Sequence, residues 1–170
     1  MHFSNHENQY FPDPTDVAAH ASAFVQLMFA YSYFEEEIRS VQNAITNDKT
    51  FGETQGYKWK TSERPERIVE LVKKHLPDIP ETEQIKTLLQ ETIEPSHQRN
   101  FLVHGEWWCF NKQTSVVTVR SGKKIPGEKQ HQNFTAADIE KLVETFKTFE
   151  AILFKLRRQI ENNRGSVPCL

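Results

Sequence analysis

The sequence predicts a mainly all-α fold, a four-helix bundle with a small β-hairpin inserted between the third and fourth long helices. Two long segments repeat apolar residues at steps of three and four, the period of one helix face. Between these two long segments, prolines mark the ends of shorter helical segments. A run rich in tryptophan and valine at 107–120 is typical of strands. The 170 residues fit one domain, 1–170, and the ends at 1–12 and 164–170 are expected to be flexible.

The first helix is expected to start at Asp13, which can cap it, with Pro14 in its first turn. A continuous seam of apolar or small residues should run to about Asn47: Val17, Ala21, Phe24, Met28, Tyr31, Phe34, Ile38, Val41 and Ile45. Residues 47–65 contain two glycines and little periodicity, and are expected to form a loop.

A shorter helix is predicted from Pro65 to Leu76, because prolines follow it directly. The next helix should open near Glu81 and run to the end of a motif at His104. Since Pro95 falls inside it, a kink or a break with restart is expected there.

The strand-like runs 107–110 and 116–120 flank four polar residues, which predicts a hairpin. Side chains alternate along a strand, so at most one of Trp107 and Trp108 should be free and the other should lie in the core. The segment 123–133 is expected to be an exposed loop.

The last helix has the clearest start. Thr135 should cap it, Asp138 should complete the capping box with a reciprocal hydrogen bond, and Phe134 should pack against Ile139. A seam with a period close to 3.5 residues predicts a long parallel or antiparallel partner helix: Ile139, Leu142, Phe146, Phe149, Leu153, Leu156 and Ile160. The helix should end near Asn163.

The composition excludes several classes of protein. With 21 Lys and Arg against 23 Asp and Glu, there is no broad basic field, so any nucleic acid would have to be recognised locally. Cys109 and Cys169 form neither a disulfide framework nor a metal pattern. Phosphate-binding glycine loops, nucleophile elbows and metalloprotease motifs are absent, so no cofactor or metal is expected. Without a long apolar run or a signal peptide, the chain is interpreted as cytoplasmic and not membrane-bound.

The segment RNFLVHGEWW, residues 99–108, contains the main candidate functional residues. On a helix, His97, Asn100 and His104 share one stripe, while Arg99 lies about 100° from Asn100, where it borders the inward face. A histidine can take or give a proton, a guanidinium can hold a phosphate, and an asparagine can orient either. Together these groups can cleave RNA without a metal, although the spacing alone favours structural roles.

The string Arg99-Asn100-x-x-x-His104, near the end of the third helix, resembles the R-x4-6-H signature of HEPN domains. The resemblance implies a helical bundle that pairs into a homodimer, with two motifs facing one cleft. Many members of the family are metal-independent endoribonucleases. The resemblance therefore also implies this activity, with Arg99 and His104 as catalytic residues and Asn100 as an assisting residue. The chain departs from a toxin-type branch that continues His-x-Tyr, because Glu106 stands where that branch has tyrosine.

Several alternatives remain open at this stage. The domain is either an endoribonuclease, a non-catalytic module that binds RNA, a nucleotide or a protein, or a toxin held by an antitoxin. Lys123 and Lys124 either follow an RNA backbone or solubilise a loop, and His97 either supports the site or faces solvent. The acidic run 35–37 either reaches Arg99 or forms a solvated face.

Overall fold

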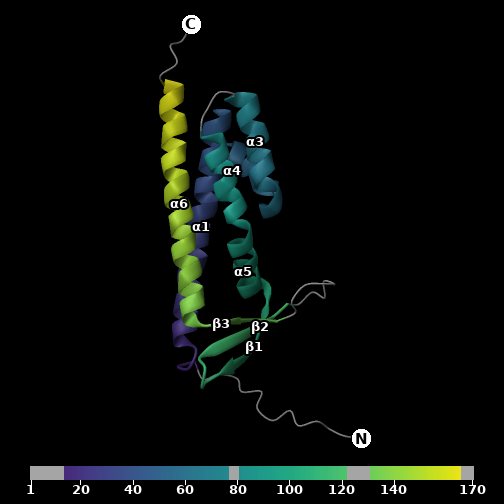
Figure 1. Ribbon diagram of the computed structural model, residues 1–170, viewed down its shortest axis with the longest axis vertical. Coiled ribbons are helices and arrows are strands. Elements are labelled where there is room, and N and C mark those ends of the chain that lie inside the picture. The colour runs from purple at the N-terminus through teal and green to yellow at the C-terminus, as the bar shows by residue number, and fades with distance from the viewer. Residues whose placement is uncertain (1–13, 77–80, 122–130, 166–170) are drawn as a thin grey trace, which may run out of the picture.

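The computed structural model describes residues 14–76, 81–121 and 131–165, a mainly helical chain with a small antiparallel sheet at one end (Figure 1). The main helices are α1 (Ala18–Thr46), α3 (Arg64–His75), α4 (Thr82–Glu91), α5 (Ile93–His104) and α6 (Ala136–Gly165). The strands are β1 (Glu106–Asn111), β2 (Val116–Arg120) and β3 (His131–Phe134). None of the described helices combines the length and apolarity of a membrane span.

The two long helices α1 and α6 lie side by side and run in the same direction (Figure 1). Phe34 packs against Phe146 near the sheet, and Arg157 bonds Glu37 further along, so residue numbers rise together on both helices. All seven residues of the expected α6 seam are buried. The sequence prediction of a long partner helix is therefore confirmed, with the parallel arrangement.

The buried face of α1 differs from its predicted seam in the first half of the helix. There the buried residues are His20, Ala23, Leu27 and Ala30, whereas Phe24 and Tyr31 are only half-buried. The reason is that α1 has neighbours on two sides. Its Ala23 face belongs to the core, and its Phe24 side meets the motif helix and the sheet. The predicted residues mark the border between the two sides, and from Phe34 onward the predicted seam is buried.

The expected loop at 47–65 is wrong in part, because short helical turns occupy most of it: α2 (Phe51–Thr54), η1 (Gly56–Lys58) and η2 (Thr61–Glu63). Asn47 ends α1 in the left-handed conformation, with φ of 56°. Gly52 then passes so close to α1 that a Cβ there would lie 2.7 Å from the Arg39 carbonyl oxygen. This packing, which no periodicity encodes, holds the segment against α1.

The helix that carries the motif breaks and restarts, as expected from Pro95, but the break lies at Thr92. Pro95 falls in the first turn of α5, where its missing N–H leaves no helical bond unmade. The Thr92 hydroxyl donates to the carbonyl of Leu89 at 2.7 Å. Helices α4 and α5 then descend beside α1 toward the sheet (Figure 1).

The predicted hairpin is present, with β1 and β2 joined by residues 112–115. The third strand, β3, was not expected, since 123–133 was interpreted as a loop. Its sequence HQNF has no apolar alternation, and it forms a strand because its backbone pairs with β2. Lys123 and Lys124 lie outside the described residues.

The start of α6 confirms the predicted cap. The Thr135 N–H donates to Asp138 Oδ2 at 2.8 Å, and the Asp138 N–H donates to Thr135 Oγ1 at 3.1 Å. Phe134 and Ile139 are both buried in the core. At its other end the helix continues to Gly165, past the expected end near Asn163, where Arg164 donates to the Ile45 carbonyl. Residues 1–13 and 166–170 lie outside the described residues, so the expected flexibility of the two ends stays a prediction.

Candidate functional site

A pocket of about 420 Å³ opens between α1, the start of α3 and the motif helix α5. Helix α1 supplies most of the lining, α3 supplies Arg64, and α5 supplies Arg99. The α1 residues are Met28, Tyr31, Ser32, Glu35 and Arg39. Three arginines and one carboxylate therefore face a small space that solvent can enter.

Arg99 lies flat against α1 in this pocket. Its guanidinium carbon sits 4.1 Å from the centre of the Tyr31 ring, a cation–π contact. Its Nη1 donates to Asn100 Oδ1 at 3.0 Å, and its Nη2 lies 4.0 Å from the sulfur of Met28. Within the described residues the buried Nε has no partner, and no carboxylate lies within ion-pair distance.

The other two arginines of the pocket are neutralised. Arg64 forms a bidentate salt bridge with Glu35, in which Nη1 donates to Oε1 at 2.6 Å and Nη2 donates to Oε2 at 2.9 Å. Arg39 bonds Glu36 at 2.6 Å. Glu35 thus serves Arg64, so the expectation that the acidic run could reach Arg99 is wrong in this respect. In the described part of the pocket, Arg99 carries the positive charge that remains uncompensated.

Tyr31 is fixed as a neutral group. Burial raises its pKa to about 12, and the charge of Glu35 together with a hydrogen bond to that carboxylate adds to the shift. Arg64 and Arg99 act in the opposite direction. At neutral pH the hydroxyl therefore stays protonated, and the ring offers Arg99 an uncharged face.

The structure separates the histidines of the motif from Arg99. His97 and His104 are exposed on the outer side of α5, and neither lines the pocket. Arg99 and His104 are five residues apart, so they lie about 140° apart around the helix. Among the described residues the structure brings Arg99 together with Asn100, and leaves His104 at the helix end without a hydrogen-bond partner.

Both tryptophans after the motif are exposed, at 36% for Trp107 and 39% for Trp108, so the expectation that one lies in the core is wrong. A β-bulge explains this result. Trp107 pairs with Val119 and Cys109 with Thr118, which leaves Trp108 as an extra residue and breaks the alternation. Trp107 is nevertheless anchored, because its indole N–H donates to the Leu102 carbonyl at 2.9 Å.

Sequence reasoning missed Tyr31 and Arg64 as site residues. Tyr31 was assigned to the core seam, and its one-turn spacing from Glu35 was the available signal. Nothing in the sequence connects Arg64 with Glu35, which lies 29 residues earlier. In the described part of the chain, no group of three His, Cys, Asp or Glu side chains is placed to hold a metal ion.

Comparisons with models of known families, with curated proteins and with solved structures find no match to this chain. The resemblance to HEPN domains therefore depends on Arg99, Asn100 and His104 and on the order of the helices.

Proposed function

We propose that this chain is a metal-independent endoribonuclease with a HEPN-like four-helix bundle, and that it acts as a homodimer. The supporting observation is the uncompensated guanidinium of Arg99 in an open pocket whose other arginines are already paired. A phosphate of the RNA backbone supplies the negative charge that the pocket lacks.

In the proposed reaction the ribose 2′-oxygen attacks the adjacent phosphorus, and the bond from phosphorus to the 5′-oxygen breaks. The proton of the 2′-hydroxyl passes to a base, and the 5′-oxygen receives a proton from an acid. His104 serves as one of these two groups, because its side chain is exposed and an imidazole can either accept or donate a proton. Arg99 stabilises the charge that grows on the phosphorane, while Asn100 holds its Nη1.

The separation of these groups within one chain supports the proposed homodimer. Arg99 faces α1 and His104 faces outward, so we propose that His104 of a second copy approaches the Arg99 pocket. Large exposed apolar residues spaced four apart on α1, Val25, Phe29 and Tyr33, support self-association. Phe29→Glu should therefore shift the sedimentation of the protein from dimer to monomer and reduce RNA cleavage. A parent protein that sediments as a monomer while cleaving RNA would contradict the dimer.

The decisive test of the function is a subunit-mixing experiment in the presence of a chelator. Arg99→Ala and His104→Ala should each lower the cleavage rate by 10²-fold or more. When the two variants are refolded together, half of the dimers are mixed and each holds one intact site, so about a quarter of the parent activity should return.

Matched controls separate chemistry from folding. Arg67 also contacts a ring, that of Trp59, and His75 is an exposed histidine on α3, so Arg67→Ala and His75→Ala should cleave like the parent. Circular dichroism must show that every variant is folded. If the parent leaves RNA intact, or if neither motif substitution changes the rate, the endoribonuclease proposal is wrong.

The second candidate is a non-catalytic module that binds RNA, a nucleotide or a protein. It is favoured by the contacts that already hold Arg99, namely the Tyr31 ring and Asn100. This alternative predicts that Arg99→Ala weakens binding of an RNA oligonucleotide but that His104→Ala changes nothing. RNA cleavage that depends on His104 would reject it.

A further inference from the structure

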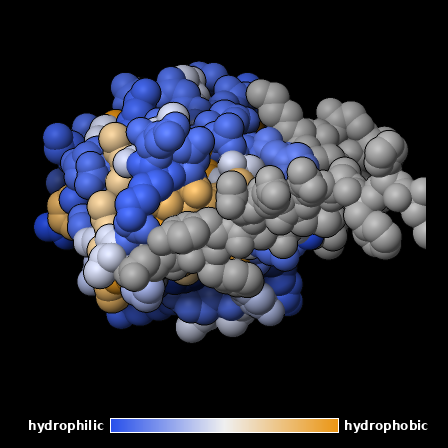
Figure 2. Space-filling view, turned by 90° about the horizontal axis from the view of Figure 1, so that it is seen from below, coloured by the Kyte–Doolittle hydropathy of each residue, from blue (hydrophilic) through white to orange (hydrophobic). Residues whose placement is uncertain are grey.

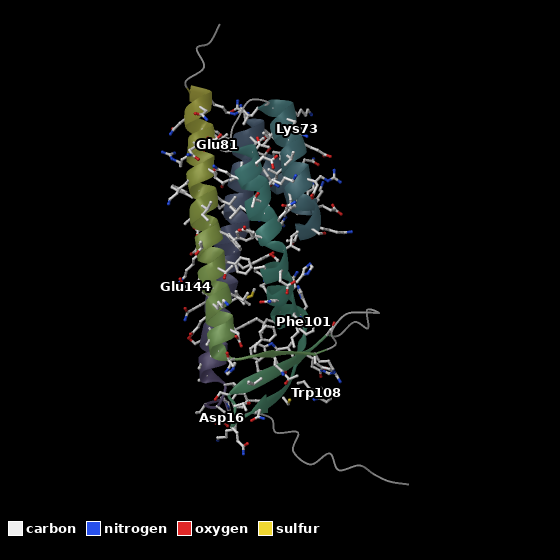
Figure 3. All side chains as sticks on the ribbon, viewed as in Figure 1. Asp16, Lys73, Glu81, Phe101, Trp108 and Glu144 are labelled. Carbon is white, nitrogen blue, oxygen red and sulfur yellow. The ribbon has the colours of Figure 1, made fainter. Side chains whose placement is uncertain are left out.

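Trp108 is an exposed aromatic residue at an irregular point of an edge strand. It is the extra residue of the bulge in β1, and β1 lies at one edge of the sheet (Figure 3). The ring is held in place by the guanidinium carbon of Arg120, 4.0 Å from its centre. Arg120 in turn bonds Glu106 at 2.5 Å. The result is a fixed, flat apolar surface with the Arg120–Glu106 ion pair beside it.

This surface lies next to the motif. A Cβ on Gly105 would lie 2.4 Å from Val119 Cγ1 and 3.1 Å from the Arg120 carbonyl oxygen, so the end of α5 contacts the end of β2. Trp108 follows His104 by four residues, a distance of at most about 13 Å in an extended chain. One extended ligand is therefore long enough to contact both His104 and Trp108.

The bulge bears on what binds at this edge. A bulge twists an edge strand and disrupts the row of backbone groups that another strand would need, so it disfavours pairing with a second strand. The ring of Trp108, by contrast, remains open to a flat group. Unpaired nucleobases stack on exposed aromatic side chains, whereas the bases of a duplex already stack on one another.

We infer that Trp108, held by Arg120, is a stacking platform for an unpaired nucleobase beside the scissile phosphate, and that the substrate is single-stranded RNA. The inference rests on the proposed function for the position of the phosphate. Stacking on a ring does not require a broad basic surface, which agrees with the net charge of −2 of the whole chain. Figure 2 views the end that carries the sheet, where hydrophobic areas are small and a mainly hydrophilic surface surrounds them.

The test measures binding of a fluorescently labelled single-stranded 2′-O-methyl oligonucleotide, which cannot be cleaved because its 2′-oxygens are blocked. Trp108→Ala should weaken binding by roughly 5- to 150-fold, the range for loss of one base–aromatic stack. Trp108→Phe keeps a flat ring and should recover most of the affinity. The same strand annealed to its complement should bind the parent more weakly than the single strand.

Tyr57 provides a matched control. It is exposed and has a neighbouring cation, Lys58, 5.7 Å from its ring centre. It lies far from the sheet, because its neighbour Gly56 packs on Gln42 of α1, whereas the sheet contacts α1 near Phe24. Tyr57→Ala should leave binding unchanged. Equal loss in Trp108→Ala and Tyr57→Ala would overturn the platform and indicate a general surface effect.

Failure of the platform can be distinguished from failure of the endoribonuclease proposal. If Trp108→Ala is folded by circular dichroism and binds the single strand within twofold of the parent, the platform is wrong whatever the cleavage assay shows. Equal affinity for single strand and duplex, or no binding of either, also overturns it. If binding depends on Trp108 but RNA is not cleaved, the platform stands and the endoribonuclease proposal falls.

Discussion

The α1–α6 pair and the α5–β1 segment differ in the burial of their side chains and in whether their arginines have ion-pair partners. Along α1 and α6 the seam is apolar and buried, and Arg157 is neutralised by Glu37 and Glu161 at 2.6 and 2.8 Å. The α5–β1 segment instead leaves His104 and Trp108 exposed and Arg99 without an ion-pair partner among the described residues. In the function that we propose, the first region provides stability and the second provides the chemistry.

The largest effect is expected in the α1–α6 pair. Phe146 is fully buried, with ring centres 5.0 Å from Tyr31 and 5.3 Å from Phe34. Phe146→Ala should lower the free energy of unfolding by about 3–5 kcal/mol, through lost burial and the cavity that remains. Trp108→Ala, in the other region, should cost less than about 1 kcal/mol because the ring is exposed. Urea denaturation measures the loss of unfolding free energy in both variants. Equal losses would contradict the assignment of stability to the α1–α6 pair.

The second prediction compares two arginines of one pocket. The side chain of Arg64 is 9% exposed and that of Glu35 is 18% exposed, so Arg64→Ala leaves a carboxylate unpaired in a poorly solvated place. The expected loss of unfolding free energy is about 3 kcal/mol. Arg99→Ala leaves no carboxylate behind and should cost about 1 kcal/mol, mainly the contact with Tyr31.

A double variant checks the cause. In Arg64→Ala with Glu35→Ala, no unpaired charge remains, so part of the lost stability should return. If Arg99→Ala destabilises the protein as much as Arg64→Ala does, Arg99 has a structural role and the pocket loses its assigned chemistry.

The third prediction concerns the turn between α5 and β1, inside the second region. Gly105 has extended backbone angles, φ −81° and ψ 161°, which any residue can adopt, so its role is steric. In Gly105→Ala the new Cβ would lie 2.4 Å from the Phe101 carbonyl oxygen and from Val119 Cγ1. We expect a loss of about 1–3 kcal/mol in thermal or urea unfolding. A gain in stability, the usual result of replacing glycine where there is space, would show that α5 and β2 are not in close contact.

The sequence was sufficient for elements whose signals are local. The cap of α6 at Thr135 and Asp138, its seam, and the proline effect on the motif helix all follow from residues close together in the chain. The hairpin is also local, because four polar residues separate its strands.

The features that sequence reasoning missed depend on contacts between distant segments. Strand β3 has no apolar alternation and is defined by its pairing with β2. The face of α1 could not be assigned, since helical periodicity does not reveal that one side meets α6 and another meets Trp107. In the candidate site, Arg99 and Asn100 were identifiable from the motif, but the pairing of Arg64 with Glu35 was not, because a salt bridge between separate helices leaves no spacing rule.

The smallest effect is expected at the cap of α6, where β3 leads into the first region. The Thr135 N–H and hydroxyl both donate to Asp138, and these bonds lower the pKa of its carboxyl group. A carboxyl group with a lowered pKa in the folded state stabilises the fold above its ordinary pKa, and the contribution is lost as the pH falls through the folded value. Asp138→Ala should therefore cost about 1 kcal/mol at neutral pH, and the difference from the parent should shrink below about pH 4.

Unfolding by urea at a series of pH values measures this dependence. The exposed Glu140, two residues further along the same helix, gives the matched control, because it lies beyond the cap and Glu140→Ala should change little at any pH. A constant loss in Asp138→Ala across the acidic range would mean that the side chain acts through packing and not through its charge. A loss that disappears on acidification would assign the effect to the ionised cap, since protonation removes the charge that strengthens both hydrogen bonds from Thr135.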